Sequence, residues 1–116
     1  MVPQSTEQAI VAAGANVAPR VTPQDIEGTI SGELFFTAGQ AARGLNLPHT
    51  DSTDLLTFCV LSLKNGFTVT GESACASPAN FNAEIGRRIA RENAVAKVWQ
   101  LEGYLLRQRL HEGFKS

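Results

Sequence analysis

The sequence predicts an α+β fold in which a small antiparallel sheet packs against a long helix. Asn-Gly at 65–66 lies between two runs of strand-forming residues, and this pair favours a hairpin turn because it tolerates positive φ at both positions. From Phe81 onward, apolar residues recur every three or four positions, as on one face of a helix. An isolated hairpin is marginal in water, so we expect the hairpin at about 55–75 to bury one face against the helix at about 78–98.

The turn sets the expected register of the hairpin. If Asn65 and Gly66 form a two-residue turn, Ser62 lies opposite Val69, and the faces of both strands follow from their alternation. The predicted core then consists of large apolar side chains from one face of the hairpin and from the helix: Phe58, Val60, Phe67, Ile85, Ile89 and Trp99.

The opposite face of the first hairpin strand is also apolar and carries Cys59, Leu61 and Leu63. One helix cannot cover both sides of a sheet, so either the N-terminal elements or another copy of the chain must cover this face. We expect the second case, with this face as the interface of a homodimer or larger assembly. In the expected register Cys59 and Cys75 do not oppose each other. They are therefore predicted to be free thiols rather than a disulfide.

The long helix has two candidate starts and one candidate break. Ser77 followed by Pro78 is a favourable start, and Asn80 is the competing cap. Gly103 costs about 1 kcal/mol relative to alanine in a helix interior. We therefore expect a break between Trp99 and Gly103, followed by a short final helix.

Two shorter elements are expected before the hairpin. Thr22 and Asp25 give a cap and a first-turn acid for a short helix that stops near Ser31 and Gly32. Residues 33–38, ELFFTA, suit either a strand or the first turn of a helix, and their three successive bulky residues favour a strand. Residues 39–53 are expected to be a loop.

Length and composition describe one globular domain. The chain has 116 residues, of which 43% are hydrophobic and 18% are charged. We expect residues 21–116 to form the single α+β domain and residues 1–20 to be flexible or weakly helical. No run of eighteen apolar residues and no secretory signal is present, so we expect no membrane association.

The polar residues do not form a recognisable catalytic or metal-binding pattern. His49 and His111 have no cysteine or carboxylate at metal-ligand spacing. Cys59 and Cys75 fall in or beside strands without an activating neighbour, and the glycines make neither a dinucleotide fingerprint nor a phosphate loop. We therefore expect no catalytic residue, no metal site and no cofactor.

Charge is distributed unevenly although the total is only −1. Residues 1–80 hold 3 basic and 7 acidic residues, and residues 81–116 hold 7 basic and 4 acidic residues. The basic side chains of the long helix are either paired with the acidic N-terminal part or are a candidate surface for an anion or an acidic partner. They lack the interleaved aromatics of a nucleic-acid binder, so nucleic acid is not the expected partner. The candidate residues are Arg87, Arg88, Arg91 and Lys97.

Four segments carry a family resemblance: VTPQDIEGTI, ELFFTA, KNGFTVTGESA and EIGRRIARENA. Over residues 21–110 the chain resembles the gene product 49 / gene product 66 family of small tailed-bacteriophage proteins. The members compared tend to have proline after the tryptophan, where this chain has Gln100, which weakens the expected helix break. The resemblance implies a phage protein, and it implies no particular activity. Because the sequence shows neither a membrane span nor a secretory signal, we expect the protein in the cytoplasm of the bacterial host cell.

Three functions are compatible with these observations. The leading one is a non-enzymatic phage accessory protein that binds a host component through a surface. The second is a protein that binds or sequesters a small anionic ligand, such as a nucleotide, with the arginine-rich helix. The third is a DNA-binding module with a helix-turn-helix beginning at Thr22, although the ELFFTA run argues against it.

Overall fold

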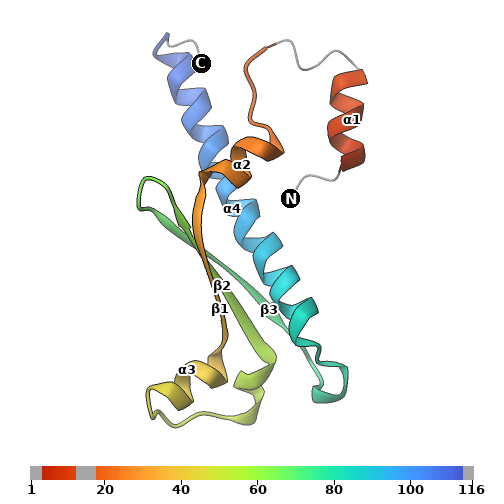
Figure 1. Cartoon of the computed structure of the whole chain (residues 1–116), viewed down its shortest axis with the longest axis vertical. Helices are drawn as coiled ribbons and strands as arrows, with labels where there is room; N and C mark the ends of the chain where they lie inside the picture. Colours follow the sequence, from red (N-terminus) through yellow and green to blue (C-terminus); the bar gives the residue numbers. More distant parts are fainter. Residues whose placement is uncertain (1–3, 13–17, 114–116) are drawn as a thin grey trace.

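The computed structural model describes residues 4–12 and 18–113, and it confirms the α+β fold. Three antiparallel strands form one sheet in the order β1-β2-β3, and the long helix α4 runs diagonally across it and projects beyond it (Figure 1). The strands are β1 (Ile30–Thr37), β2 (Leu56–Leu63) and β3 (Thr68–Ala74). The helices are α1 (Gln4–Ala12), α2 (Pro23–Thr29), α3 (Ala38–Gly44) and α4 (Ala83–His111), with 3₁₀ turns η1 (Asp51–Leu55) and η2 (Pro78–Asn80).

A capping box starts α2, as the sequence predicts. The Asp25 amide donates to Thr22 Oγ1 at 3.1 Å, and the Thr22 amide donates to Asp25 Oδ2 at 2.9 Å. The chain then passes directly into β1, so the strand predicted for residues 33–38 is also confirmed. Ile26 of α2 is 1% exposed, and its side chain packs this short helix against the core.

The hairpin turn has three residues instead of the expected two. The Leu63 amide donates to the Phe67 carbonyl at 2.8 Å, and the Gly66 amide donates to the Leu63 carbonyl at 2.9 Å. Gly66 has φ +90, a conformation that suits glycine. Leu61 therefore lies opposite Val69, one residue away from the predicted register. A shift of one residue in the register changes which side chains of the two strands share a face, so Val69 lies on the same face as Leu61.

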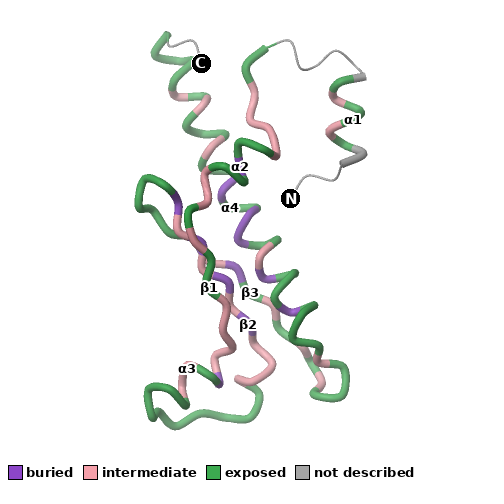
Figure 2. The backbone as a smooth tube through the Cα atoms, viewed as in Figure 1, coloured by how far each residue is buried: buried purple, intermediate pink, exposed green. Residues whose placement is uncertain are grey.

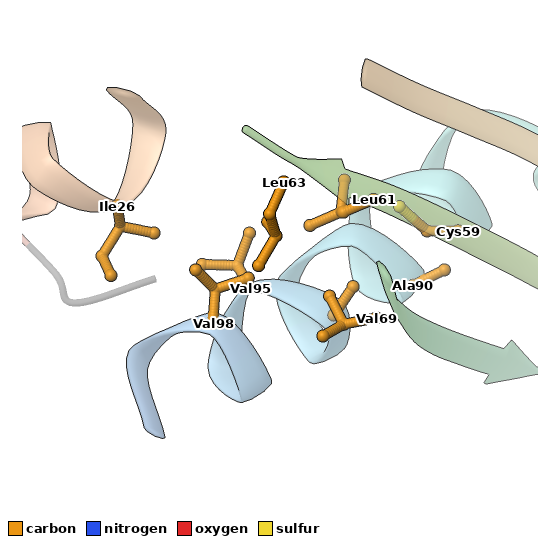
Figure 3. Packing of buried hydrophobic residues seen from close by; sticks show 9 residues of the cluster. Ile26, Cys59, Leu61, Leu63, Val69, Ala90, Val95 and Val98 are labelled. Atoms are coloured by element: carbon orange, nitrogen blue, oxygen red, sulfur yellow. The ribbon is translucent and has the colours of Figure 1, made fainter. Parts of the chain in front are cut away.

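The buried face of the sheet is consequently the opposite of the predicted one. Phe67 and Ile85 are 55% and 51% exposed, so the predicted core is wrong for these residues, and Ile89 is also exposed. Trp99 is half-buried and packs against the core from its margin. Burial follows one side of the sheet and the facing side of α4 (Figures 2 and 3). The core consists of Ile26, Cys59, Leu61, Leu63, Val69, Ala90, Ala94, Val95 and Val98.

Small residues explain why α4 presents this side to the sheet. A β-carbon added to Gly71 would lie 2.1 Å from the Ala90 carbonyl oxygen and 2.3 Å from the Ala94 amide nitrogen. The backbone of α4 thus rests directly on β3 at this glycine. A helix side carrying Ala90 and Ala94 fits that approach, whereas a side carrying isoleucines would hold the layers apart.

Both predicted ends of the long helix are corrected. Its cap is Asn82, whose side chain accepts from the Ile85 amide at 3.0 Å, whereas the residues after Ser77 form the 3₁₀ turn η2. The helix continues through Gly103 to His111, so there is no break and no separate final helix. The cost of one glycine, about 1 kcal/mol, is not enough to interrupt a helix of 29 residues.

The expected loop over residues 39–53 contains two helical segments. A second capping box starts α3, because the Gln40 amide donates to Thr37 Oγ1 at 3.1 Å and the Thr37 amide donates to Gln40 Oε1 at 2.8 Å. The turn η1 follows before β2. These segments lie at the end of the sheet, away from the part where α2 meets α4 (Figure 1).

The side of the sheet that faces away from α4, here called the outer face, also carries apolar side chains. Leu34 is opposite Val60 and Phe36 is opposite Phe58 across β1 and β2. The two phenylalanine rings stack with their centroids 5.4 Å apart. Leu34 is 58% exposed, and no helix among the described residues packs across this face.

Candidate functional site

A cleft of about 300 Å³ opens at the end of the sheet where β1 runs into α3. It brings together parts of the chain that are far apart in sequence: the end of β1, α3, η1, the start of β2 and the start of α4. Its size is at the lower limit of typical ligand pockets. The lining residues are Phe35, Phe36, Thr37, Gln40, Arg43, Asp54, Thr57, Phe81, Ala83 and Arg87.

An arginine and an aspartate form an ion pair on one side of the cleft. Arg43 Nη2 lies 2.8 Å from Asp54 Oδ1, and the guanidinium holds the pKa of that carboxyl below its usual range. The contact is close but poorly aligned, so Asp54 Oδ1 accepts no hydrogen bond of normal geometry. The carboxylate presses against the first turn of α3, where a β-carbon on Gly39 would lie 1.9 Å from Oδ1. Only a glycine at this position leaves room for it.

The floor of the cleft contains a buried hydroxyl without a partner. Thr57 is 3% exposed, and its Oγ1 makes no hydrogen bond. It packs close to Gly86 at the start of α4, where an added β-carbon would lie 2.9 Å from Oγ1. A buried polar atom left unpaired costs about 1–3 kcal/mol. Thr57 also lines the cleft, so this unpaired atom lies next to the space that a bound molecule would occupy.

The four basic residues singled out from the sequence do not form one surface. Arg87 lines the cleft, and Arg88 and Lys97 are exposed elsewhere on α4. None of these three forms an ion pair within the described residues. Arg91, one turn after Arg87, is occupied by carboxylates of the same chain.

Arg91 ties three elements together. Its Nε donates to Glu33 of β1 at 2.8 Å, and its two terminal nitrogens donate to Glu27 of α2 at 3.1 and 2.8 Å. These contacts raise the pKa of Arg91 and lower the pKa of Glu27. The guanidinium is therefore used to hold α2 and β1 against α4, and it is not free to grip a ligand.

The expected assembly face must also be corrected. Cys59, Leu61 and Leu63 are 0%, 0% and 5% exposed, because α4 covers them. They lie in the core and cannot form the interface that the sequence predicts for them. One helix covers only one face of the sheet, and the face that α4 leaves open is the outer face.

The cysteines and histidines offer no activated nucleophile in the described part of the chain. Both cysteines are free thiols, and burial raises the pKa of Cys59, which keeps it protonated. The Cys75 thiol donates to the Ser77 carbonyl at 3.2 Å, and His49 Nδ1 lies 3.1 Å from the carbonyl of Leu47. No group of three potential metal ligands occurs in residues 4–12 and 18–113.

Most of the cleft residues were missed from the sequence. One signal was available: Thr37 and Gln40 have capping-box spacing, which predicts the start of α3 and so places Arg43 on a helix. The meeting of Arg43, Asp54 and Arg87 depends on tertiary packing, and no local pattern reveals it.

None of the helices in the described ranges combines the length and the apolar character that crossing a membrane requires. Comparison with curated proteins and with solved structures finds no match to this chain. The model of one protein family matches residues 21–110, which confirms the resemblance noted from the sequence. The chain therefore belongs to the phage protein (N4 Gp49/phage Sf6 gene 66) family.

Proposed function

We propose that the protein is a non-enzymatic phage accessory protein that binds a small anionic component of the host cell, of the nucleotide class, in the cleft beside α3. One observation carries this proposal. Arg87, which pairs with no carboxylate of the described residues, lines the same cleft as the buried, unpartnered hydroxyl of Thr57.

The chemistry of the lining suits a ligand with an anionic part and a planar part. A guanidinium presents forked donors that match phosphate or carboxylate oxygens. The rings of Phe35, Phe36 and Phe81 supply apolar surface against which a base can pack. Gln40 adds a side-chain amide nitrogen that can donate hydrogen bonds, while its oxygen already accepts from the Thr37 amide. The ion pair of Arg43 with Asp54 leaves part of that guanidinium available, since its side chain is 53% exposed.

This cleft favours the small-ligand alternative over binding through a broad basic surface. Arg91 is already engaged by Glu27 and Glu33, and Arg88 and Lys97 are separated from Arg87 around the helix. The basic residues therefore do not gather into a patch for an acidic protein. The DNA-binding alternative lacks its geometry, because α2 leads directly into β1 and no recognition helix follows it.

Thermal unfolding in the presence of single ligands tests the proposal. The panel contains nucleotides, inorganic phosphate and a non-nucleotide polyanion such as citrate. A ligand at 100 times its dissociation constant stabilises the folded protein by about 2.7 kcal/mol, which a melting curve detects readily. The proposal fails if no nucleotide raises the melting temperature, or if citrate and phosphate act as strongly as every nucleotide.

Two adjacent arginines provide a matched pair of variants. Arg87→Ala removes the cleft guanidinium, and Arg88→Ala removes an exposed neighbour that does not line the cleft. We expect the first to abolish ligand-induced stabilisation and the second to preserve it, with both ligand-free proteins melting near the wild-type temperature. Equal responses of the two variants would contradict binding in the cleft.

Thr57→Val tests the buried hydroxyl separately. Valine has nearly the same shape without the unpaired oxygen, so the ligand-free protein should become more stable, by up to about 1–3 kcal/mol. Ligand affinity should fall at the same time. A residue of purely structural importance would not show a gain in stability together with a loss of binding.

A further inference from the structure

The N-terminal end of α4 forms part of the cleft beside α3, because Ala83, its first residue, lines that cleft. Asn82 caps the helix: its side chain accepts from the Ile85 amide at 3.0 Å, and its carbonyl accepts from the Gly86 amide at 2.9 Å. The two preceding amides, those of Ala83 and Glu84, have no acceptor among the described residues. The start of α4 therefore has two hydrogen-bond donors to offer a ligand.

A second and independent feature lies beside this helix end. Thr57 is 3% exposed, and its Oγ1 makes no hydrogen bond. The hydroxyl is directed at the first turns of α4, since a β-carbon on Gly86 would lie 2.9 Å from Oγ1 but 3.6 Å from the Thr57 β-carbon. Both Thr57 and Ala83 line the cleft, so a buried, unpartnered hydroxyl and an open helix end border the same space.

The positive charge at this end of the cleft matches one phosphate group. A helix N-terminus carries about half an elementary charge, and the guanidinium of Arg87, which pairs with no carboxylate of the described residues, adds a full one. A phosphate monoester carries about −1.5 to −2 charges and three acceptor oxygens. Helix amides and a guanidinium are the donors that bind such oxygens. Glu84, the acid in the first turn, does not line the cleft.

The other arginine of the cleft does not extend this site to a second phosphate. Arg43 keeps part of its guanidinium exposed, but the Asp54 carboxylate lies 2.8 Å away and cancels its charge. Asp54 is itself 43% exposed and lines the cleft, so a longer phosphate chain would meet a like charge there. The volume of about 300 Å³, at the lower limit of ligand pockets, also favours a small ligand.

We infer that the ligand of the cleft is a nucleoside monophosphate, with its single phosphate at the N-terminal end of α4. This inference rests on the proposed function and adds to it the number of phosphates and the part of the ligand that meets the helix. The base then packs against the phenylalanine rings that line the cleft.

Isothermal titration calorimetry tests the number of phosphates. The probes are AMP, GMP, CMP and UMP, their diphosphates and triphosphates, and the four nucleosides without phosphate. We expect at least one monophosphate to bind about tenfold or more tightly than both its nucleoside and its triphosphate. A triphosphate that binds as tightly as its monophosphate would overturn the inference and leave the proposed function intact. Absence of binding by every nucleotide would overturn both.

Ala83→Pro tests the placement of the phosphate. Proline at the first position of a helix removes one amide donor without interrupting the helix, and Asn82 before it already has an extended backbone, with φ −134° and ψ 116°. Ala83→Val is the matched control, because valine has similar bulk and keeps the amide. Circular dichroism verifies that both variants are folded.

We expect Ala83→Pro to weaken monophosphate binding about tenfold and to leave nucleoside binding unchanged, and Ala83→Val to bind like the wild type. Unchanged monophosphate binding by Ala83→Pro, or an equal loss in both variants, would overturn the placement at α4. If Arg87→Ala still abolished binding in that case, the proposed function would stand without this phosphate site.

Discussion

The inner and outer faces of the sheet carry similar apolar side chains but have different surroundings. On the inner face Leu61 is fully buried beneath α4, whereas on the outer face Leu34 is 58% exposed. Large apolar residues occur on both faces and therefore do not explain which face is covered. Small residues do explain it, because Gly71 on the inner face lets the backbone of α4 approach at Ala90 and Ala94. A helix therefore selects its face of a sheet by where its backbone can approach as much as by where the bulkiest side chains lie.

Gly71→Val should have the largest effect on this difference. Its β-carbon would lie 2.1 Å from the Ala90 carbonyl oxygen, and α4 must move away from β3 to admit it. We expect a loss above the usual overpacking cost of about 1–3 kcal/mol, enough to unfold much of the population at 37 °C. Circular dichroism melting measures it. Thr70→Val, which points to the outer face, is the control and should melt near the wild type.

Leu61→Ala should be the next most harmful change. Removal of a fully buried leucine costs about 2–5 kcal/mol. Leu34→Ala makes the same chemical change on the outer face and should cost the isolated subunit less than about 1 kcal/mol, because the side chain is 58% exposed. Urea unfolding compares them. Similar losses in dilute, monomeric protein would show that the outer face is covered within the chain.

Arg91→Gln tests the hydrogen bonds by which α4 holds α2 and β1 at the edge of the core. Hydrogen bonds to charged groups contribute about 1.5–3 kcal/mol when buried, but Glu27 and Glu33 are 46% and 37% exposed, so we expect a loss of roughly 1–2 kcal/mol. Arg88→Gln is the control and should be neutral. Chemical denaturation gives both values, and an equally neutral Arg91→Gln would show that the ion pairs do not stabilise the fold.

Acid should slightly weaken the contact between α2 and α4 that Glu27 and Arg91 make. Arg91 lowers the pKa of Glu27 below its ordinary value of 4.5, so the folded state favours the ionised carboxylate. The resulting stability is fully present above 4.5 and is lost as the pH falls through the lowered value, because the unfolded chain binds the proton first. Half-exposure limits the effect to less than about 1 kcal/mol. Urea titrations at successive pH values should show a smaller acid loss in Arg91→Gln than in the wild type.

Local signals predicted the elements well and their packing poorly. The capping box at Thr22, the strand over residues 33–38 and the hairpin all follow from short-range chemistry, and the structure confirms them. The same type of capping signal at Thr37 was available and correctly reports α3. The predicted end of the long helix was wrong because one glycine, Gly103, costs only about 1 kcal/mol and does not interrupt α4, which continues to His111.

The prediction of which face of the sheet is buried was wrong for a more specific reason. The first hairpin strand is apolar on both sides, so alternation along it does not say which side is buried. The decision then depended on the turn, and Asn-Gly fits both a two-residue turn and the observed three-residue turn with Gly66 at φ +90. An error of one residue in the register therefore reversed both the predicted core and the predicted interface. The cleft was beyond local signals, since Arg43, Asp54 and Arg87 meet only after folding.

The contact at Gly71 also determines how the core responds to lost volume. Helix and sheet already touch through backbone atoms there, so the two layers have no room to move closer when a neighbouring side chain is shortened. A cavity made beneath α4, for example by Leu61→Ala, should persist instead of collapsing, and the penalty should fall near the upper end of its range. Such a space is lined by aliphatic groups and should stay dry, so xenon or a small hydrocarbon should enter it and restore part of the lost stability.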